Sequence, residues 1–490
     1  MMKKPLRPPK LRFIIAPLII LLFFAHPFPG MCLEKHRGIT GPFASLGEVT
    51  RSCLQCHRSA AEEVISSTHW TWMRDRVING EKILYGKKDS LTSFAVDVTS
   101  NPERCMACHI STTRPRVDLT APAPELVDCL VCHDTTGIYR HTKPEDRSSG
   151  DYERMARSVG RPSPANCTVC HFADCGLPGA DQSGITRKGS YFNDIHLDPA
   201  IAGLTCQECH KAKSGHIFSR TVERRNGFTS GKGCEACHTT TPHRLGSLNR
   251  HTASVACQTC HIPSFAPERP VIIGWNWLMT GKSNRVYRFS GNERFLAQDE
   301  NGFTFSTLLE PSYLWDDGSD VVYARGQRVR PRELTYLQRP TEKKPASKIM
   351  PFRVIYSTQL YDTKYRYLIS PLLRPEGSSF FPGSDWEAVA REGMRAIVLP
   401  FSGEFAFAPT AAFRRINHGV VPAEEALDCL DCHGARGRMD WSSLGFDRDP
   451  WSGEPVDTGT ENLGTGASET APGLLPQPVK ESLVPAGSAF

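Results

Sequence analysis

Eight copies of the pattern Cys-x-x-Cys-His dominate this chain of 490 residues. The cysteines of the eight copies are Cys53, Cys56, Cys105, Cys108, Cys129, Cys132, Cys167, Cys170, Cys206, Cys209, Cys234, Cys237, Cys257, Cys260, Cys429 and Cys432. The histidines that follow them directly are His57, His109, His133, His171, His210, His238, His261 and His433. Two thiols one turn apart can reach both vinyl groups of one porphyrin, and the adjacent imidazole then lies under the iron. The pattern therefore predicts eight covalently bound haem c groups.

Other uses of paired cysteines fit this sequence poorly. A zinc ribbon, a disulfide staple or a redox dithiol would explain one copy by itself, but these motifs seldom fix a histidine after the second cysteine. The motifs use 16 of the 18 cysteines and leave only Cys32 and Cys175. A disulfide framework is therefore excluded, and the implied function class is electron transfer through iron.

The histidine count nearly matches what eight haems require. Nine of the 17 histidines lie outside the motifs, namely His26, His36, His69, His141, His196, His216, His243, His251 and His418. His26 falls in the N-terminal leader, so eight remain for eight distal positions. A low-spin haem takes a second strong axial ligand, commonly histidine. Most haems are thus predicted to be bis-His, with room for one or two that carry another distal group and can do chemistry.

The N-terminus has the pattern of a secretory signal. Five basic residues precede or begin an apolar run over residues 13–25, which is short for a membrane span. No clean Ala-x-Ala site precedes Met31, so an uncleaved anchor or lipidation at Cys32 stay as alternatives. Without residues 1–31, which hold no acidic side chain, the formal charge falls from +6 to +1. We expect a periplasmic protein that binds no nucleic acid and meets a membrane only through such an anchor.

The expected fold class is a multihaem cytochrome c of short helices and loops packed around eight haems, with a β-containing haem-free lobe. The expected divisions are a signal peptide at 1–31, a seven-motif haem domain at 32–261, the lobe at 262–416, an eighth-haem segment at 417–444 and a disordered tail at 445–490. Helices are predicted at 60–76, 151–159 and 423–428, and strands at 353–356 and 364–369. The lobe is interpreted as a scaffold or lid that shields haems from water.

Several longer strings carry more specific information than the motifs do. They include THWTW at 68–72, NPERC at 101–105, DCLVCHDTTG at 128–137, CQECHK at 206–211, CQTCHIP at 257–263, PFRV at 351–354 and NHGV at 417–420. Through these strings, residues 33–450 resemble the octahaem c-type cytochromes of the tetrathionate reductase type.

The resemblance implies a ligand set. It implies that seven haems are bis-His and that the distal ligands are His36, His69, His196, His216, His243, His251 and His418. It also implies a lysine amine on the second haem in sequence order, where substrate binds. Lys188 is the candidate for that ligand, with Asp181 or Asp174 as its acidic partner, although the spacing departs from the family pattern. A ligating lysine must be neutral, which requires a lowered pKa. His141 is then left as a surface histidine.

A second departure concerns a thiol. The family carries a cysteine in a segment between motifs one and two, where this chain has Ala95. Either that thiol chemistry is missing, or Cys175 supplies it from the loop that carries Lys188; an inert buried cysteine is the simpler interpretation of Cys175.

Two functions follow as hypotheses. The first is a reductase of tetrathionate, nitrite or hydroxylamine at the lysine-ligated haem, fed by an electron-donor redox protein or a quinol-linked cytochrome. The second is a non-enzymatic electron conduit in which every iron is closed by two ligands. A hydroxylamine oxidoreductase is disfavoured because residues 445–490 contain no tyrosine for a haem cross-link.

Overall fold

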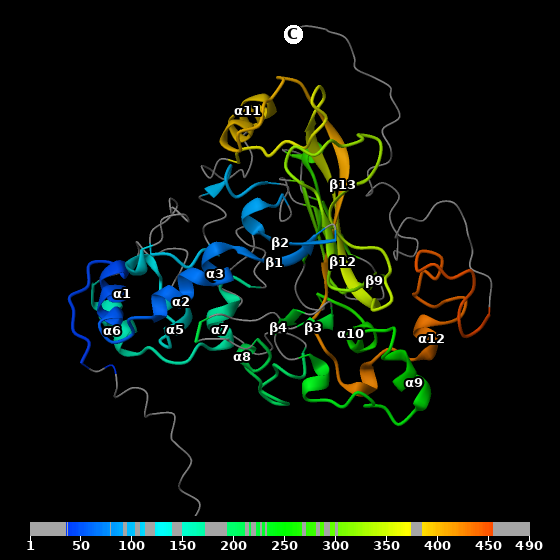
Figure 1. The fold of residues 1–490 in the computed structure, drawn as a ribbon, viewed down its shortest axis with the longest axis horizontal. Helices are drawn as coiled ribbons and strands as arrows, with labels where there is room; N and C mark the ends of the chain where they lie inside the picture. Colours follow the sequence, from blue (N-terminus) through cyan, green and yellow to red (C-terminus); the bar gives the residue numbers. More distant parts are fainter. Residues whose placement is uncertain are drawn as a thin grey trace, which may run out of the picture.

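The structure is a computed structural model, and the fold is visible over most of the chain (Figure 1). The described residues are 36, 38–78, 80–91, 96–102, 108–112, 123–139, 149–171, 194–210, 215–216, 222–225, 228–230, 233–266, 271–280, 285–288, 295–298, 302–373 and 385–453. Within these ranges, no helix combines the length and the hydrophobicity of a membrane span.

The helices are short and cluster around the Cys-x-x-Cys-His motifs. They are α1 (Leu46–Leu54), α2 (Ala60–Ser66), α3 (Thr68–Thr71), η2 (Lys87–Asp89), η4 (Pro124–Leu126), α5 (Leu130–His133), α6 (Ser149–Arg157), α7 (Pro164–Thr168), α8 (Cys206–Cys209), η6 (Cys234–Ala236), α9 (Gly246–His251), α10 (Cys257–His261), η7 (Trp277–Met279), α11 (Trp386–Ala396), η8 (Ala423–Glu425) and α12 (Cys429–Cys432). Several helices have a side-chain N-cap. At the start of α12, for example, the Asp428 carboxylate accepts hydrogen bonds from the backbone N–H groups of Leu430 and Asp431. Such short helices gain their stability from packing and not from propensity.

One large mixed sheet forms most of the remaining structure. Its described strands are β1 (Met73–Ile78), β2 (Glu81–Gly86), β5 (Val271–Asn276), β6 (Arg285–Arg288), β7 (Phe295–Gln298), β8 (Phe303–Ser306), β9 (Ser312–Asp316), β10 (Asp320–Val322), β11 (Thr335–Pro340), β12 (Lys348–Asp362) and β13 (Phe405–Arg415). Their order is β2-β1-β10-β11-β13-β12-β5-β8-β7-β6, with β9 on β12. A separate hairpin joins β3 (Val222–Arg225) and β4 (Phe228–Ser230).

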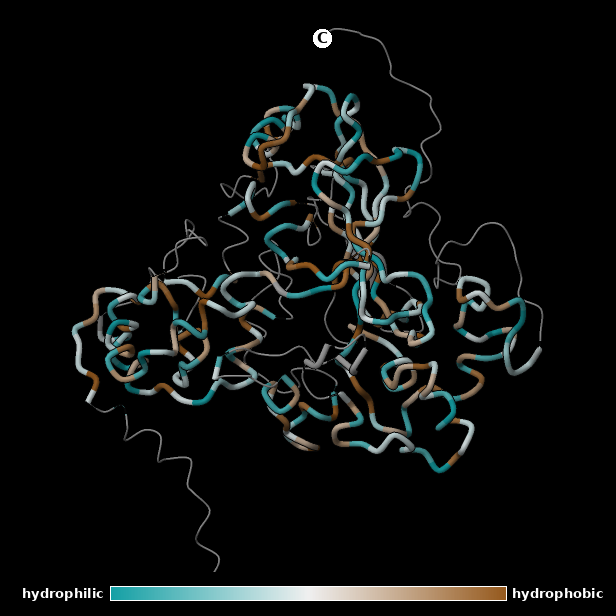
Figure 2. Tube along the Cα trace, in the orientation of Figure 1, coloured by the Kyte–Doolittle hydropathy of each residue, from teal (hydrophilic) through white to brown (hydrophobic). Residues whose placement is uncertain are grey.

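The long strand β12 is the axis of this sheet. It pairs antiparallel with β13 along its C-terminal part, from Phe352↔Arg415 to Asp362↔Phe405, and parallel with β5. Figure 1 shows α1 to α8 on one side of the sheet, α9, α10 and α12 near its lower end, and α11 at the opposite end. Figure 2 shows apolar stretches gathered along the central strands and more scattered in the helical part. The sheet thus supplies the largest of the described apolar clusters, and two smaller clusters lie among the helices of the motif-bearing part.

Two tryptophans and a short helix close the core at the α11 end. Trp275 and Trp277 are buried among neighbouring side chains of the sheet, and α11 adds Met394. Gly393 of α11 passes directly over the preceding loop: a Cβ there would lie 2.0 Å from the Ser370 carbonyl oxygen. Only glycine allows that approach.

A buried ion network joins the N-terminal hairpin β1–β2 to the rest of the sheet. Ile78 of β1 pairs in parallel with Asp320 of β10, and the Arg76 guanidinium donates to the Asp320 carboxylate. Arg415 reaches Asp320 at 2.9 Å and Asp316 at 2.6 Å, and all four side chains are more than nine-tenths buried. The sheet is therefore not confined to residues 262–416, because it takes two strands from the region expected to hold only haems.

Several expected elements differ in the structure. The helix predicted at 60–76 is wrong beyond Ser66: the chain breaks at Ser67, forms α3, and continues as strand β1. The strand predicted at 364–369 is a turn after Asp362, followed only by isolated bridges of Tyr367 and Leu368. Its alternating pattern reflects an aromatic turn packed on the sheet. The helix predicted at 151–159 and the strand at 353–356 are confirmed, and 423–428 holds only a 3-10 turn.

Candidate haem sites

The seven motifs that the structure describes in full share one backbone geometry. In six of them the backbone N–H of the histidine donates to the carbonyl of the first cysteine, over 2.8–3.1 Å; they are the motifs of His57, His133, His171, His210, His238 and His433. This helical turn gathers two thiols and the imidazole at one place, which is what a porphyrin with two thioether bonds requires. For Cys257–His261 the same turn is helix α10, anchored to β12 by a bond from Thr259 Oγ1 to the Ile349 carbonyl at 2.8 Å.

Seven motif histidines each face a histidine from outside the motifs. The ring-centroid distances are 6.2 Å for His36–His57, 6.0 Å for His69–His171, 6.0 Å for His133–His216, 6.1 Å for His196–His238, 6.2 Å for His210–His418, 6.1 Å for His243–His261 and 6.3 Å for His251–His433. The seven partners are the seven histidines that the family resemblance implied. Five of these pairs join residues that are distant in sequence, so the fold and not the local chain brings them together.

This spacing fits a six-coordinate haem iron. An imidazole nitrogen lies about 2.0 Å from a bound metal and roughly 1.1 Å from its own ring centre, so two imidazoles on one iron have centres roughly 6.2 Å apart. The seven observed distances, 6.0–6.3 Å, bracket that value. The residues therefore fit haem held between two histidines.

Burial keeps these imidazoles in the form that binds iron. Burial, with a smaller effect of the facing His171, lowers the pKa of His69 to about 4. Burial likewise lowers the pKa of His418 to about 4, helped by the facing His210. Both rings are neutral at pH 7, and a neutral imidazole is the metal ligand.

Three of the paired imidazoles are hydrogen-bonded through Nδ1 to a carboxylate. His216 Nδ1 lies 2.9 Å from Glu63, His196 Nδ1 lies 3.1 Å from Asp194, and His433 Nδ1 lies 2.6 Å from Asp449. Such pairing fixes the tautomer and ring orientation and increases the electron donation of the ring to a metal. The Asp194 carboxylate also accepts from the backbone of Gly419 and Val420, directly after His418, and so connects two sites.

Asp449 is held firmly in this role. Burial acts to raise the pKa of its carboxyl, but backbone hydrogen bonds from Gly434 and Trp451 outweigh that effect and lower the pKa below its usual value. Trp441 stacks on the His433 ring at 5.0 Å between centroids, and Trp451 meets it edge-on at 5.5 Å. The packed chain thus continues past residue 445, where the tail was expected to begin.

The second motif has different surroundings. His109 is fully buried between Trp70 and Trp72, with ring centroids 4.9 Å and 5.1 Å away. Gly86 lets Trp72 take this position, because a Cβ there would lie 1.9 Å from the Trp72 carbonyl oxygen. The Lys87 ammonium lies 5.0 Å from the Trp72 ring centre. None of the seven histidine pairs described above includes His109.

Motifs that are distant in sequence lie side by side. The thiols of Cys53 and Cys129 are within hydrogen-bond reach of each other, and so are the thiols of Cys167 and Cys206. The Leu427 backbone N–H donates to the Cys260 carbonyl at 3.0 Å, which sets the eighth motif against the seventh. Haems on such neighbouring motifs would lie close enough to exchange electrons.

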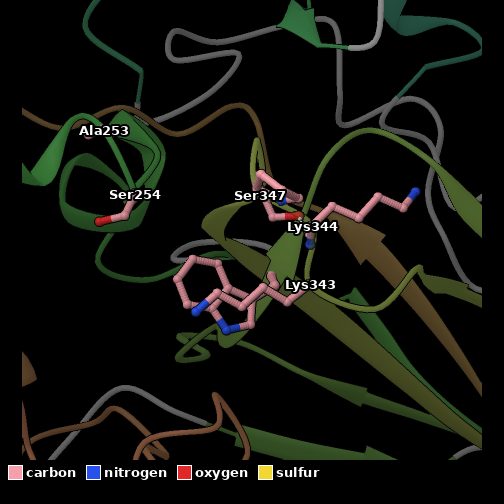
Figure 3. A pocket seen from close by; sticks show the side chains of 7 residues that line it. Ala253, Ser254, Lys343, Lys344 and Ser347 are labelled. Carbon is pink, nitrogen blue, oxygen red and sulfur yellow. Dashed lines mark hydrogen bonds between the residues drawn. The ribbon is translucent and has the colours of Figure 1, made fainter.

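A shallow hollow of about 390 Å³ opens beside the His251 helix, lined by Ala253, Ser254, Trp315, Lys343, Lys344, Pro345 and Ser347. Figure 3 shows Ala253 and Ser254 on the helical side, apart from the loop that carries the two lysines. Lys344 is engaged with Asp317 at 2.8 Å, and Lys343 lies 3.9 Å from the Trp315 ring centre. Both lysine ammonium groups thus already interact with other side chains of the protein, and the hollow is a poor candidate for an anion-binding site.

Other predicted site residues lie outside the described residues. They are Cys105 of the second motif, Ala95, His141, Asp174, Cys175, Asp181 and Lys188. Sequence reasoning missed Trp70 and Trp72 as neighbours of His109, and it missed the carboxylates Glu63, Asp194 and Asp449. No spacing rule links an acidic residue to a histidine that it meets only after folding.

Comparison with known proteins gives matches to c-type cytochromes. Among solved structures, the octahaem cytochrome c from Shewanella oneidensis matches at 33% sequence identity with a TM-score of 0.72, covering 85% of this chain and 98% of that chain. Three family models match parts of the sequence: "Cytochrome c bacterial" at 273–436, "Cytochrome c7 and related cytochrome c" at 191–262, and "Cytochrome c554 and c-prime" at 52–134. Curated proteins gave no match.

Proposed function

The chain belongs to the octahaem c-type cytochromes, electron-transfer proteins with covalently bound haem c, and from this we propose that it carries eight haems and reduces a small sulfur oxyanion or nitrogen compound beside His109. The proposed substrates are tetrathionate, nitrite and hydroxylamine. The supporting observation is the contrast between seven histidine pairs at 6.0–6.3 Å and the different surroundings of His109.

The proposed ligand set assigns a role to each kind of residue. Cysteine pairs would hold the porphyrins, and the facing histidines would bind seven of the irons, so these sites would carry electrons and bind no substrate. The eighth ligand set consists of His109 with Lys188 as an exchangeable amine. Haem iron supplies the one-electron steps when it is bound.

Residues around His109 would prepare the site for an anion. Trp70 and Trp72 exclude water from the proximal side, and Lys87 adds positive charge close by. Asp181 and Cys175 are proposed to act from the loop that carries Lys188, Asp181 as the partner of the amine and Cys175 as the thiol that replaces the one missing at Ala95. Reduction of tetrathionate takes two electrons from the donor protein, breaks the central S–S bond and releases two thiosulfate ions.

Export follows from the same proposal. Covalent attachment of haem c takes place outside the cytoplasm, and the basic and apolar residues before Met31 are typical of a secretory leader. We place the protein in the periplasm, with a redox protein or a quinol-linked cytochrome as donor. The electron conduit is the second candidate function, favoured by Ala95, which removes the family thiol.

The test is turnover of the holoprotein with reduced viologen as donor and tetrathionate, nitrite or hydroxylamine as acceptor, in wild type and Lys188→Ala. We expect Lys188→Ala to show a new high-spin signal in electron paramagnetic resonance and an altered rate with one acceptor. Lys82→Ala is the matched control, since Lys82 is an exposed lysine paired with Asp75. Full reduction of every haem without turnover of any acceptor would favour the conduit.

A further inference from the structure

The eighth motif has the strongest outer hydrogen bond found on a described motif histidine. His433 Nδ1 lies 2.6 Å from Asp449 Oδ1, and the same carboxylate accepts from the backbone of Gly434 at 2.6 Å and of Trp451 at 2.9 Å. Asp449 is only 4% exposed. A buried carboxylate with a fixed position and a short bond to the ring shifts electron density into the imidazole.

The neighbouring seventh site differs in this respect. Its proposed distal ligand, His243, has a buried Nδ1 with no hydrogen-bond partner among the described residues. When Nε2 binds iron, Nδ1 carries the proton, and without an acceptor this ring is a weaker donor to the metal. The two sites are adjacent, because Leu427 donates to the Cys260 carbonyl between the two motifs.

From this contrast we infer that Asp449 lowers the reduction potential of the eighth haem below that of the seventh and so makes the eighth site the end at which electrons arrive. The inference rests on the proposed ligand pairs His251–His433 and His243–His261. A more strongly donating imidazole stabilises the ferric over the ferrous iron, and a lower potential results. One electron delivered to this end by an external redox protein then passes towards the seventh site in the favourable direction.

The surface near the eighth motif agrees with this role. Cys429 is exposed, and Trp451, which meets the His433 ring edge-on, is 60% exposed. Cys429, which would carry a thioether bond, and the indole of Trp451 would both be accessible to a partner at this site. By contrast, His109 is fully buried. Electrons would thus arrive at the surface of the protein and be used in its interior.

The test is Asp449→Asn in the holoprotein, which keeps the shape and an acceptor oxygen but removes the charge. Hydrogen bonds to charged groups are about twice as strong as neutral ones, so we expect about a tenfold change in the ratio of oxidised to reduced eighth site at a fixed potential. For a one-electron couple this is an upward shift of about 59 mV in one midpoint. Asp447→Asn is the matched control, since it removes the same charge two residues earlier from an exposed position.

The measurement is a potentiometric titration followed by visible spectroscopy and electron paramagnetic resonance, after intact mass shows that all haems are attached. One midpoint raised in Asp449→Asn and unmoved in Asp447→Asn supports the inference, as does a midpoint close to wild type in Asp449→Glu, which keeps the charge. An unchanged titration in Asp449→Asn overturns it, as does an equal upward shift in Asp449→Glu.

His251→Ala separates this inference from the proposed function. If His251→Ala creates a high-spin signal while Asp449→Asn titrates like wild type, the ligand pair stands and the role of Asp449 is refuted. If His251→Ala leaves every signal low-spin, the pair His251–His433 is wrong, and both the inference and that part of the proposed function fall.

Discussion

Asp320→Asn tests whether the buried ion network fastens the N-terminal hairpin to the sheet. Asp320 is 2% exposed and accepts from both Arg76 and Arg415. Burial acts to raise the pKa of its carboxyl, but the charges of Arg415 and Arg76 prevail and lower it from 3.8 to about 2. At 1.36 kcal/mol per pH unit, that difference corresponds to roughly 2 kcal/mol of folding free energy at neutral pH.

The substitution leaves two guanidinium groups buried with less compensation. Breaking a buried ion pair from one side costs about 3–5 kcal/mol, so we expect a loss of about 2–4 kcal/mol at pH 7. The pKa of Asp320 is lower in the folded protein than in the unfolded chain. Its contribution is therefore complete above pH 4 and is lost as the pH falls towards 2. The gap between wild type and Asp320→Asn should close over that same range.

The assay is urea unfolding of the holoprotein followed by far-ultraviolet circular dichroism between pH 7 and pH 2. Asp75→Asn is the matched control: Asp75 lies on the same strand as Arg76, and its pair with Lys82 is more than half exposed on both sides. An exposed pair is worth about 0–1 kcal/mol, so this variant should stay close to wild type. Equal midpoints for the two variants at pH 7, or a gap that persists unchanged at pH 2, would refute the reasoning.

Two further substitutions test the sites and the core. Asp194→Ala should perturb the low-spin paramagnetic resonance signals of two haems at once, because this carboxylate holds His196 and also the backbone beside His418; a change confined to one signal would contradict the link. Gly393→Ala should lower the stability of the folded protein by about 1–3 kcal/mol in thermal unfolding, since its Cβ would lie 2.0 Å from the Ser370 carbonyl oxygen. Gly38→Ala is a suitable comparison, because no atom lies within 4 Å of a Cβ at that position and its backbone is not in the left-handed region; equal effects would disprove the steric explanation.

The fold class could be predicted because covalent attachment of haem c requires a recognisable sequence motif. A Cys-x-x-Cys-His motif is local, so eight such motifs can be counted without any structure, and the assignment to octahaem c-type cytochromes is confirmed by the comparison. Histidine counting and the family resemblance named the seven residues that the structure places opposite motif histidines, whereas their binding to iron stays a prediction. Reduction of tetrathionate, nitrite or hydroxylamine and the role of Lys188 stay predictions.

Elements that depend on distant contacts were less predictable. The chain after α3 forms strand β1, which pairs with β10, a strand that is distant in sequence. Arg76 of β1 also donates to the Asp320 carboxylate of β10. The Asp449 contact to His433 likewise exists only after the C-terminal segment folds back on the motif. Local propensity carries no information about either contact.

The pairing of His210 with His418 has a consequence for how the protein matures. His418 follows the strands from β5 to β13 in sequence, whereas His210 precedes them and follows only β1 and β2 of this sheet. Under the proposed ligand pairing, a haem attached at Cys206 and Cys209 would lack its second axial ligand until the strands from β5 to β13 have been synthesised. Chains truncated within the sheet would carry this haem with one coordination position open to peroxide and other small oxidants. If His210 and His418 bind one iron as proposed, completion of the sheet would thus protect that haem, and an unfinished molecule would be the more vulnerable to oxidation.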